Sequence, residues 1–267
     1  MPRSITAFSN PLVKQARALR DKKQRRREGL FLAEGLRILT EAREAGSIPV
    51  ILFFGAGQQH PLLDALIAAT EAAGGEVIET NAEILHKISG KENPQLVLGI
   101  YAAFDTSLAK IDRGGADLWL VAQALRDPGN LGTMLRTGDA VGAGGLILVD
   151  ECVDPFSVEA VRASMGALFT QRIAAAPWRE FLPWLRSGAG ELVGTSLATE
   201  TDYQAPRYRR PCFILIGNEA QGLPADYEQA CDTLVRIPMR GKADSLNAAV
   251  AAAVMAYEVT NQWRRDG

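Results

Sequence analysis

The feature that most constrains the fold lies near the end of the chain, where a polar loop separates a short apolar segment from an alanine-rich one. Residues 234–237 favour a strand, and Pro238 ends it because proline cannot donate a ladder hydrogen bond. After a glycine-containing loop, Asp244 or Ser245 is predicted to cap a helix whose residues 248–256 are small and apolar. Such a helix is expected to be closely packed and buried. Its free N–H groups would then lie beside the polar loop, which predicts a binding site there.

Segments typical of strands and of helices alternate along the rest of the chain. This alternation predicts an α/β fold with mostly parallel strands. The segment 106–116, which contains two consecutive glycines, is the predicted linker. A chain of 267 residues suits one large or two modest domains. We therefore expect a smaller N-terminal α/β domain at 1–105 and a larger C-terminal domain at 117–267.

Positive charge is concentrated at the start of the chain. The net charge of the whole chain is −2, yet residues 1–30 contain nine Lys or Arg and only two acids. A basic block on an otherwise balanced protein favours contact with nucleic-acid phosphates. A solvated helix face is the alternative interpretation. The predicted RNA-binding residues are Lys14, Arg17, Lys22, Lys23, Arg25, Arg26 and Arg27.

Two further stretches place glycines and polar residues directly after predicted strands. In residues 127–137, Asn130 is predicted to cap a helix that carries Arg136. In residues 214–224, a buried strand leads into Gly217, which permits close approach of the backbone to a ligand, and then into an amide and a carboxylate. Since α/β proteins bind ligands at the carboxyl ends of parallel strands, both stretches predict a site. Taken singly, an ordinary surface cation and a strand-ending turn explain them as well.

The residue types that are missing limit the chemistry. Both histidines, His60 and His86, lie in the first domain, so the second has no Ser-His or Cys-His nucleophile pair and no histidine metal ligand. Three widely spaced cysteines form no zinc pattern and favour free thiols in a reducing cytosol, and no metal site is predicted. No phosphate-binding glycine motif is present. No apolar run is long enough to span a membrane, and a cytoplasmic protein is expected.

Three motifs, ordered along the chain, resemble those of the SpoU/TrmH family of RNA ribose 2′-O-methyltransferases in the SPOUT superfamily. The first is Asn130-x-Gly132-x-x-x-Arg136, the second runs from Ile216 to Glu219 with Gly222-Leu223-Pro224, and the third joins Ile237-Pro238-Met239 to Ser245-Leu246-Asn247. The resemblance covers residues 116–263. The first domain is similar, less sharply, to the family's substrate-binding domain, an α/β fold shared with some ribosomal proteins.

The resemblance implies a C-terminal segment that threads through a loop as a deep trefoil knot, an exception to the rule that protein chains are unknotted. It implies S-adenosylmethionine as the cofactor, bound within the knot. It also implies a homodimer formed through the C-terminal domain, with the site completed across the interface. The implied cofactor-binding residues lie on loops after the strands: Thr195, Leu215, Ile216, Gly217, Asn218, Ile237, Pro238, Met239, Ser245, Leu246 and Asn247.

The reaction that the resemblance implies is attack of a ribose 2′-oxygen on the sulfonium methyl group, with loss of the hydroxyl proton. The family assigns the base role to Arg136. Because arginine stays protonated with a pKa above about 12, phosphate binding or stabilisation of the developing alkoxide is the alternative role. Asn130 would hold the loop or the ribose, Glu219 would orient Arg136 or the substrate, and Ser245 and Asn247 would bind the cofactor and cap the last helix.

The expected substrate is ribosomal RNA. A separate first domain with a basic leading helix is more similar to the family's ribosomal-RNA enzymes than to its compact transfer-RNA enzymes. The basic arm would contact phosphates without reading sequence. Ribose methylation of transfer RNA is one alternative. A non-catalytic RNA-binding protein that kept the fold is the other, and the presence of all five implied catalytic residues counts against it.

Overall fold

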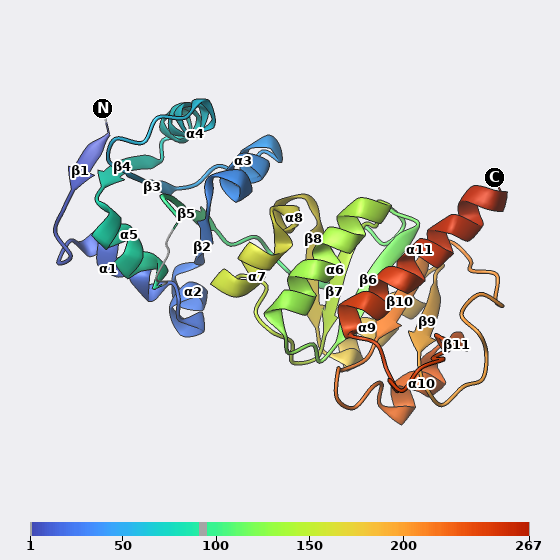
Figure 1. The fold of residues 1–267 in the computed structure, drawn as a ribbon. Coiled ribbons are helices and arrows are strands. Elements are labelled where there is room, and N and C mark those ends of the chain that lie inside the picture. Colours follow the sequence, from blue (N-terminus) through green and yellow to red (C-terminus); the bar gives the residue numbers. More distant parts are fainter. Residues whose placement is uncertain (1, 91–94, 267) are drawn as a thin grey trace. The chain divides into compact units, whose positions relative to one another are not determined.

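The structure, a computed structural model, describes residues 2–90 and 95–266, which form two compact units. The first unit combines Met1–Phe104 with Asp154–Thr170, and the second combines Asp105–Val153 with Gln171–Gly267 (Figure 1). The domain boundaries given above stay a prediction. By packing, however, Asp154–Thr170 groups with the N-terminal residues rather than with its neighbours in sequence.

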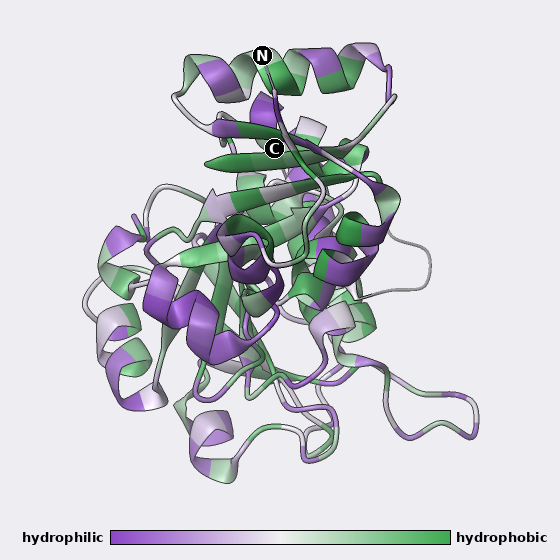
Figure 2. Cartoon of the chain, turned by 90° about the vertical axis from the view of Figure 1, so that its left-hand side faces the viewer, coloured by the Kyte–Doolittle hydropathy of each residue, from purple (hydrophilic) through white to green (hydrophobic). Residues whose placement is uncertain are grey.

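The first unit is built on a mixed sheet. Its strand order is β1-β4-β3-β5-β2, with β1, β3 and β4 parallel to one another and β5 antiparallel to both β3 and β2. Figure 2 shows strands of this sheet mainly in the colour of hydrophobic residues. The strands are β1 (Arg3–Ile5), β2 (Leu30–Glu34), β3 (Ile51–Gly55), β4 (Glu76–Thr80) and β5 (Val97–Ala102).

Five helices of this unit come from the N-terminal part of the chain. The basic segment forms two helices rather than one, because Asp21 accepts hydrogen bonds from the N–H groups of Lys23 and Gln24 and so caps a second start. Apolar residues of the first and fifth helices share a buried cluster with the sheet. The helices are α1 (Pro11–Ala18), α2 (Lys22–Glu28), α3 (Leu36–Glu44), α4 (Pro61–Ala72) and α5 (Ala82–Ser89).

Two short helices of the same unit come from the later segment. They are α7 (Val158–Ser164) and α8 (Ala167–Thr170). They are separated at Met165 and Gly166, whose φ angles of 52° and 104° are incompatible with a right-handed helix. Phe156 and Phe169, at the ends of this segment, pack against Phe31 with ring centroids 5.0 and 6.0 Å away.

The second unit has a wholly parallel sheet with strand order β11-β9-β10-β6-β7-β8. The chain runs from β6 outward through β7 to β8, and then returns to the other side of β6 for β9, β10 and β11. The strand order therefore reverses between β6 and β10, which is where open α/β sheets bind ligands. The strands are β6 (Leu118–Gln123), β7 (Gly145–Val149), β8 (Arg172–Ala176), β9 (Glu191–Thr195), β10 (Cys212–Ile216) and β11 (Thr233–Val235).

Helices cover this sheet on both sides. On one side α6 (Pro128–Val141) and α11 (Ala248–Asp266) pack against each other and against β6 (Figure 1). On the other, α9 (Trp178–Arg186) contributes Phe181 and Leu185 to a buried cluster with Trp119 and Phe213 of the sheet. The remaining helices are α10 (Ala225–Ala230) and the short 3₁₀ turn η1 (Leu108–Lys110), which lies within the predicted linker.

The start of α6 differs from the prediction, whereas α11 is capped by Asn247, as the resemblance implied, and not by Asp244 or Ser245, as the local pattern favoured. Helix α6 is capped by Asp127, whose carboxylate accepts the N–H of Asn130, so Asn130 lies inside the helix rather than at its cap. Helix α11 begins at Ala248, and the Asn247 side chain accepts the N–H groups of Ala249 and Val250 at 2.9 and 3.3 Å. At α6 the capping residue, Asp127, precedes the predicted Asn130, and at α11 the capping residue, Asn247, follows Asp244 and Ser245. The side chains of Asn130 and Ser245 are therefore available for other contacts.

Candidate active site

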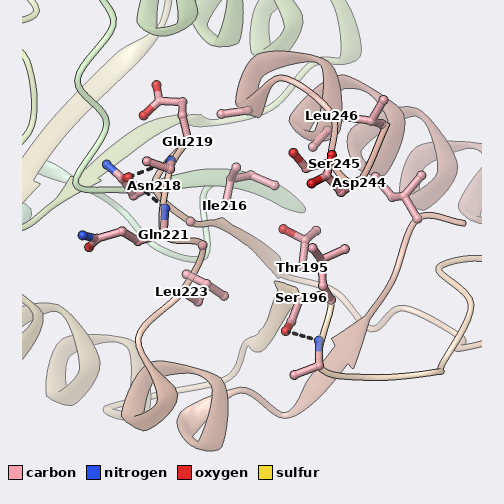
Figure 3. Close-up of a pocket in the computed structure, with 18 of the residues that line it drawn as sticks. Thr195, Ser196, Ile216, Asn218, Glu219, Gln221, Leu223, Asp244, Ser245 and Leu246 are labelled. Atoms are coloured by element: carbon pink, nitrogen blue, oxygen red, sulfur yellow. Dashed lines mark hydrogen bonds between the residues drawn. The ribbon is translucent and has the colours of Figure 1, made fainter. Parts of the chain in front are cut away.

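A cavity of about 450 Å³ lies at the carboxyl ends of β9, β10 and β11 (Figure 3). Figure 3 shows Asn218 and Glu219 on one side and Asp244, Ser245 and Leu246 on the other, with Ile216 between them. We call this cavity the cofactor pocket. Its lining residues are Thr195, Ser196, Leu197, Ala198, Ile216, Gly217, Asn218, Glu219, Ala220, Gln221, Gly222, Leu223, Glu228, Ile237, Met239, Asp244, Ser245, Leu246, Ala248 and Ala251.

Most of the implied cofactor residues line this pocket, and three do not. Leu215 is fully buried in the sheet, whereas Pro238 and Asn247 lie on the loop between β11 and α11 without lining the pocket. The structure brings together the other eight, namely Thr195, Ile216, Gly217, Asn218, Ile237, Met239, Ser245 and Leu246. Their roles stay predictions, but the three sequence motifs do converge on one cavity.

The pocket also contains residues that the sequence reasoning missed. Ser196, Leu197 and Ala198 follow β9 and belong to none of the three sequence motifs. Glu228 enters from α10, and its carboxylate accepts a hydrogen bond from the Ser196 hydroxyl, which in turn accepts the Ala198 N–H at 2.9 Å. No local pattern distinguishes Glu228 from Asp226, the other acid of α10, so only the folded geometry could have found it.

The loop after β10 is held rigidly by its own backbone. Asn218 and Gly222 exchange N–H to C=O hydrogen bonds of 3.1 and 2.9 Å. A Cβ atom at Gly217 would lie 2.4 Å from the carbonyl carbon of Gly222, so no other residue fits there without moving the backbone. The Asn218 side chain accepts the Ala220 N–H at 2.9 Å and donates to the Ala124 carbonyl at 2.8 Å, which ties this loop to the end of β6.

A chain of side-chain hydrogen bonds joins the three motifs. Asn130 Nδ2 donates to Glu219 Oε1 at 3.0 Å, and Asn247 Nδ2 donates to Asn130 Oδ1 at 2.8 Å. Asn130 is buried, with 8% of its surface exposed. Because its amide uses both ends, it fixes Glu219 and Asn247 at once. These three residues line a second cavity of about 490 Å³, the acceptor pocket, together with Arg126, Asp127, Asn218 and Ala220.

Arg136 is not part of this arrangement. It is exposed on α6, and its side chain makes no hydrogen bond or ion pair with residues 2–90 and 95–266. It lines neither the cofactor pocket nor the acceptor pocket, and Glu219 contacts Asn130 instead of Arg136. Ser245, by contrast, lies in the cofactor pocket, exposed to solvent.

The cysteine thiols are not activated as nucleophiles. Burial raises the pKa of Cys152 to about 11 and that of Cys231 to about 12, and it also raises the pKa of the fully buried Cys212. All three therefore stay protonated near neutral pH. In the part of the chain that the structure describes, no group of three His, Cys, Asp or Glu side chains could hold a metal ion.

Six of the seven predicted RNA-binding residues are exposed on α1 and α2, and the seventh is not. Arg25 is 6% exposed and forms an ion pair with Asp154 at 2.6 Å, while its Nη1 donates to the carbonyls of Leu19 and Arg20. The prediction was wrong for Arg25, because a guanidinium with these buried partners is unavailable to phosphate. The exposed residues are Lys14, Arg17, Lys22, Lys23, Arg26 and Arg27.

Comparison with known proteins agrees with this geometry. Residues 117–257 match the SpoU rRNA Methylase family, and residues 10–99 match the MRM3-like substrate binding domain. An AdoMet-bound rRNA methyltransferase from Sinorhizobium meliloti has 39% identity over 97% of both chains and a TM-score of 0.90. The 23S rRNA (uridine(2479)-2′-O)-methyltransferase of Streptomyces viridochromogenes is 31% identical over 97% of this chain and 92% of its own length. The 23S rRNA (guanosine(2553)-2′-O)-methyltransferase of Bacillus subtilis is 28% identical over 96% and 99%.

These similarities define an α/β RNA methyltransferase that uses S-adenosylmethionine and modifies a ribose 2′-hydroxyl. Within that class, the chain belongs to the SpoU rRNA Methylase family. No helix in the described ranges 2–90 and 95–266 has the length and apolar character needed to cross a membrane.

Proposed function

We propose that this enzyme methylates a ribose 2′-hydroxyl of 23S ribosomal RNA in the cytoplasm. The observation that carries the proposal is the hydrogen-bonded chain of Asn247, Asn130 and Glu219, which lies in the acceptor pocket beside the cofactor pocket. The relatives from Streptomyces viridochromogenes and Bacillus subtilis are similar over almost their whole length, and both are 23S rRNA methyltransferases.

The cofactor pocket suits S-adenosylmethionine. Its volume is that of a small-molecule site. Ile216, Leu223 and Leu246 offer apolar surface, and the rigid loop at Gly217 allows backbone to approach a flat ligand. When bound, the cofactor supplies an electrophilic methyl group on a positively charged sulfur. Asn218 and Glu219 line both pockets, so a methyl group could pass between them.

Glu219 is placed to serve the acceptor hydroxyl. Asn130 holds one carboxylate oxygen, which leaves the other for the ribose. The 2′-oxygen forms a bond to the methyl carbon as the carbon–sulfur bond breaks, sulfur keeps the electron pair, and the hydroxyl proton passes to Glu219. Asn247 fixes Asn130, and Ser245 contacts the cofactor. Positioning of the two reactants supplies much of the rate.

A homodimer explains the exposed position of Arg136. Val250 and Tyr257 of α11 are 46% and 55% exposed, and Val254 between them is half-buried, so α11 presents an apolar stripe. The helix packs on α6, which carries Arg136. We propose that a second copy covers this stripe and that Arg136 of each chain reaches the acceptor pocket of the other, where it binds phosphate or stabilises the alkoxide.

Two further parts of the chain have proposed roles. The exposed basic residues of α1 and α2 contact RNA phosphates. The segment from β11 through α11 threads a loop of the second unit as a deep trefoil knot, which is supported by the close packing of α11 on α6, β6 and β10. Mechanical stretching from both ends would test the knot, since a knotted chain extends to less than its full contour length.

The function is tested by transfer of labelled methyl from S-adenosylmethionine to unmodified ribosomal and transfer RNA. We expect label in 23S rRNA at one position that resists alkaline cleavage. Label in transfer RNA alone would reject the proposed substrate. Bound cofactor without transfer to naked RNA or to ribosomal particles would reject the enzymatic function.

A further inference from the structure

A third cavity adjoins the acceptor pocket and contains residues that the motifs do not account for. It has a volume of about 540 Å³ and lies at the carboxyl ends of β6 and β10, where the strand order reverses. Arg126 and Asn218 line both this cavity and the acceptor pocket. We call it the amide pocket, because three of its lining residues, Gln123, Asn218 and Gln221, carry side-chain amides. The other lining residues are Ala124, Arg126, Gly222, Leu223 and Pro224.

The floor of the amide pocket is Gln123, a polar residue with only 7% of its surface exposed. It follows Trp119 and Val121 in the alternation of β6, so its side chain lies on the face of the sheet that α9 covers. Its Nε2 donates to Asp150 Oδ2 at 3.3 Å. Among the described residues, its Oε1 accepts no hydrogen bond, and Gln123 lines the cavity, so this acceptor is available to a ligand there.

The orientation of this amide is fixed from behind. Asp150 Oδ2 also accepts the Tyr227 hydroxyl at 2.8 Å, and Asp150 Oδ1 accepts the Trp178 N–H at 2.9 Å. Tyr227 stacks on Trp178 with ring centroids 3.8 Å apart. Because a carboxylate only accepts, the Gln123 nitrogen must face Asp150. The Gln123 oxygen is therefore left as an acceptor within the pocket.

Two residues with side-chain donors, Gln221 and Arg126, line the same pocket. Gln221 is exposed, its side-chain amide makes no hydrogen bond to the rest of the described chain, and Figure 3 shows it pointing away from the cofactor pocket. The Arg126 side chain is 60% exposed. Among the described residues it forms one ion pair, to the 83% exposed Glu151, and the distance between the charged atoms is long at 3.7 Å. Such an exposed pair is weak and easily exchanged for a ligand.

An acceptor with a donor beside it matches one edge of two nucleobases. Guanine and uracil present a ring N–H beside a carbonyl oxygen, whereas adenine and cytosine present a ring nitrogen acceptor beside an amine. We propose that the amide pocket binds the base of the nucleotide being methylated and selects guanine or uracil. Gln123 Oε1 accepts the ring N–H, and Gln221 or Arg126 donates to the carbonyl oxygen beside it. This inference rests on the proposed function, since the ribose of the same nucleotide would occupy the acceptor pocket.

The test is to measure binding of the four nucleoside 5′-monophosphates to the full chain saturated with S-adenosylhomocysteine. NMR or calorimetry gives the four dissociation constants. We expect GMP and UMP to bind at least about tenfold more tightly than AMP and CMP, because the wrong edge leaves Gln123 Oε1 facing another acceptor. N1-methyl-GMP, in which a methyl group replaces the hydrogen of the ring N–H, should bind as poorly as AMP.

Two variants separate the pocket from general effects. Gln123→Met keeps the length of the side chain and should bring all four dissociation constants within about twofold of one another. Arg126→Gln should weaken GMP and UMP, while Arg179→Gln, which changes an 84% exposed arginine of α9, should change nothing. If Gln123→Met fails to fold, N1-methyl-GMP and Arg126→Gln still decide.

Equal binding of the four nucleotides, no binding by any of them, or a preference that survives Gln123→Met would overturn the proposal. Transfer of labelled methyl to 23S rRNA by the enzyme without substitutions is measured in parallel. This second measurement distinguishes failure of the base-binding proposal from failure of the proposed function. Transfer without base preference rejects the amide pocket alone, whereas absence of transfer rejects the function on which it rests.

Discussion

Asn130 donates a hydrogen bond of 3.0 Å to Glu219, a residue 89 positions later in the chain. The contact joins the start of α6 to the loop after β10. Neither residue lies near the other in sequence, and the amide of Asn130 is itself held by Asn247. The carboxylate in the acceptor pocket is therefore positioned by an amide whose orientation is set from a third part of the chain.

We expect Asn130→Asp to lower methyl transfer by about 100-fold or more, because it replaces a donor by a carboxylate facing Glu219. Cofactor affinity should stay within about twofold, since Asn130 does not line the cofactor pocket. Calorimetry with S-adenosylmethionine and a single-turnover assay measure the two effects. Gln229→Glu makes the same charge change on the exposed side of α10 and serves as the control. Normal turnover in Asn130→Asp would remove this contact from the mechanism.

Arg136→Ala and Glu219→Gln should each keep the fold and cofactor binding and lose most of the activity. If Arg136 serves the partner's acceptor pocket, a heterodimer of the two variants contains one site with both changes and one site with neither. Mixing equal amounts of the inactive variants should then restore about a quarter of the normal rate, because half of the dimers are mixed. If both residues served the same pocket in one chain, mixing would restore nothing.

Glu228→Gln should weaken binding of S-adenosylmethionine while leaving S-adenosylhomocysteine unchanged. Among the residues that the structure describes, the lining of the cofactor pocket includes Glu219, Glu228 and Asp244 and no Lys, Arg or His. The methyl donor carries one more positive charge than the demethylated product, and removing one nearby carboxylate costs about 1 kcal/mol, or about fivefold in affinity. Titration calorimetry with both ligands gives the ratio. The exposed Glu200→Gln is the control, and equal losses for both ligands would mean that Glu228 binds a part they share.

Replacing Lys22, Lys23, Arg26 and Arg27 by glutamine should weaken RNA binding and reduce its salt dependence. Each phosphate contact contributes about 0.7 to the slope of log affinity against log salt for single strands, so the slope should fall by up to about 3. Filter binding over a range of salt concentrations measures it. Arg25→Gln should behave differently, because breaking a buried ion pair costs about 3 kcal/mol or more of stability. An unchanged slope in the fourfold variant would make these helices an ordinary solvated surface.

Asp232 should contribute to the acid sensitivity of the fold. Burial alone would raise the pKa of Asp232, but hydrogen bonds from the Arg186 guanidinium and the Leu192 N–H lower it below the ordinary value of 3.8. Because the pKa is lowered on folding, this stabilisation is complete above pH 3.8 and is lost as the pH falls below it. Asp232→Asn should lower the melting temperature at neutral pH and flatten its fall in acid. The exposed Asp226→Asn should do neither.

The sequence predicted the parts of the site that depend on local pattern. Buried strands that end at Gly217 and Pro238, followed by polar loops, indicated where ligands bind, and the structure brings eight of the implied cofactor residues around one cavity. The sheet of the second unit followed from the alternation of strands and helices. Such patterns extend over about ten neighbouring residues, so they can be recognised without knowledge of the tertiary fold.

The sequence did not predict features that depend on distant partners. Strand β1 has only three residues, Arg3–Ile5, and gains its hydrogen bonds from β4, more than seventy positions later. Arg25 could not be distinguished from Arg26 and Arg27, because its partner Asp154 is 129 residues away. The local pattern favoured Asp244 or Ser245 as the cap of the last helix, whereas the resemblance implied Ser245 and Asn247, and it is Asn247 that accepts the Ala249 N–H. The pattern alone could not decide, because the position of α11 on α6 determines which side chain reaches the free N–H groups.

The return of Asp154–Thr170 to the first unit has a consequence for how the protein is made. During synthesis, residues 1–104 emerge with the Arg25 side chain lacking its carboxylate and with Phe31 lacking the rings of Phe156 and Phe169. The first unit can complete its core only after residue 170 has left the ribosome, by which time β6, α6 and β7 of the second unit have also emerged. Parts of both units are therefore present outside the ribosome before the first unit can finish folding. Since the first unit is made of two separate segments, no single cut in the chain separates the two units.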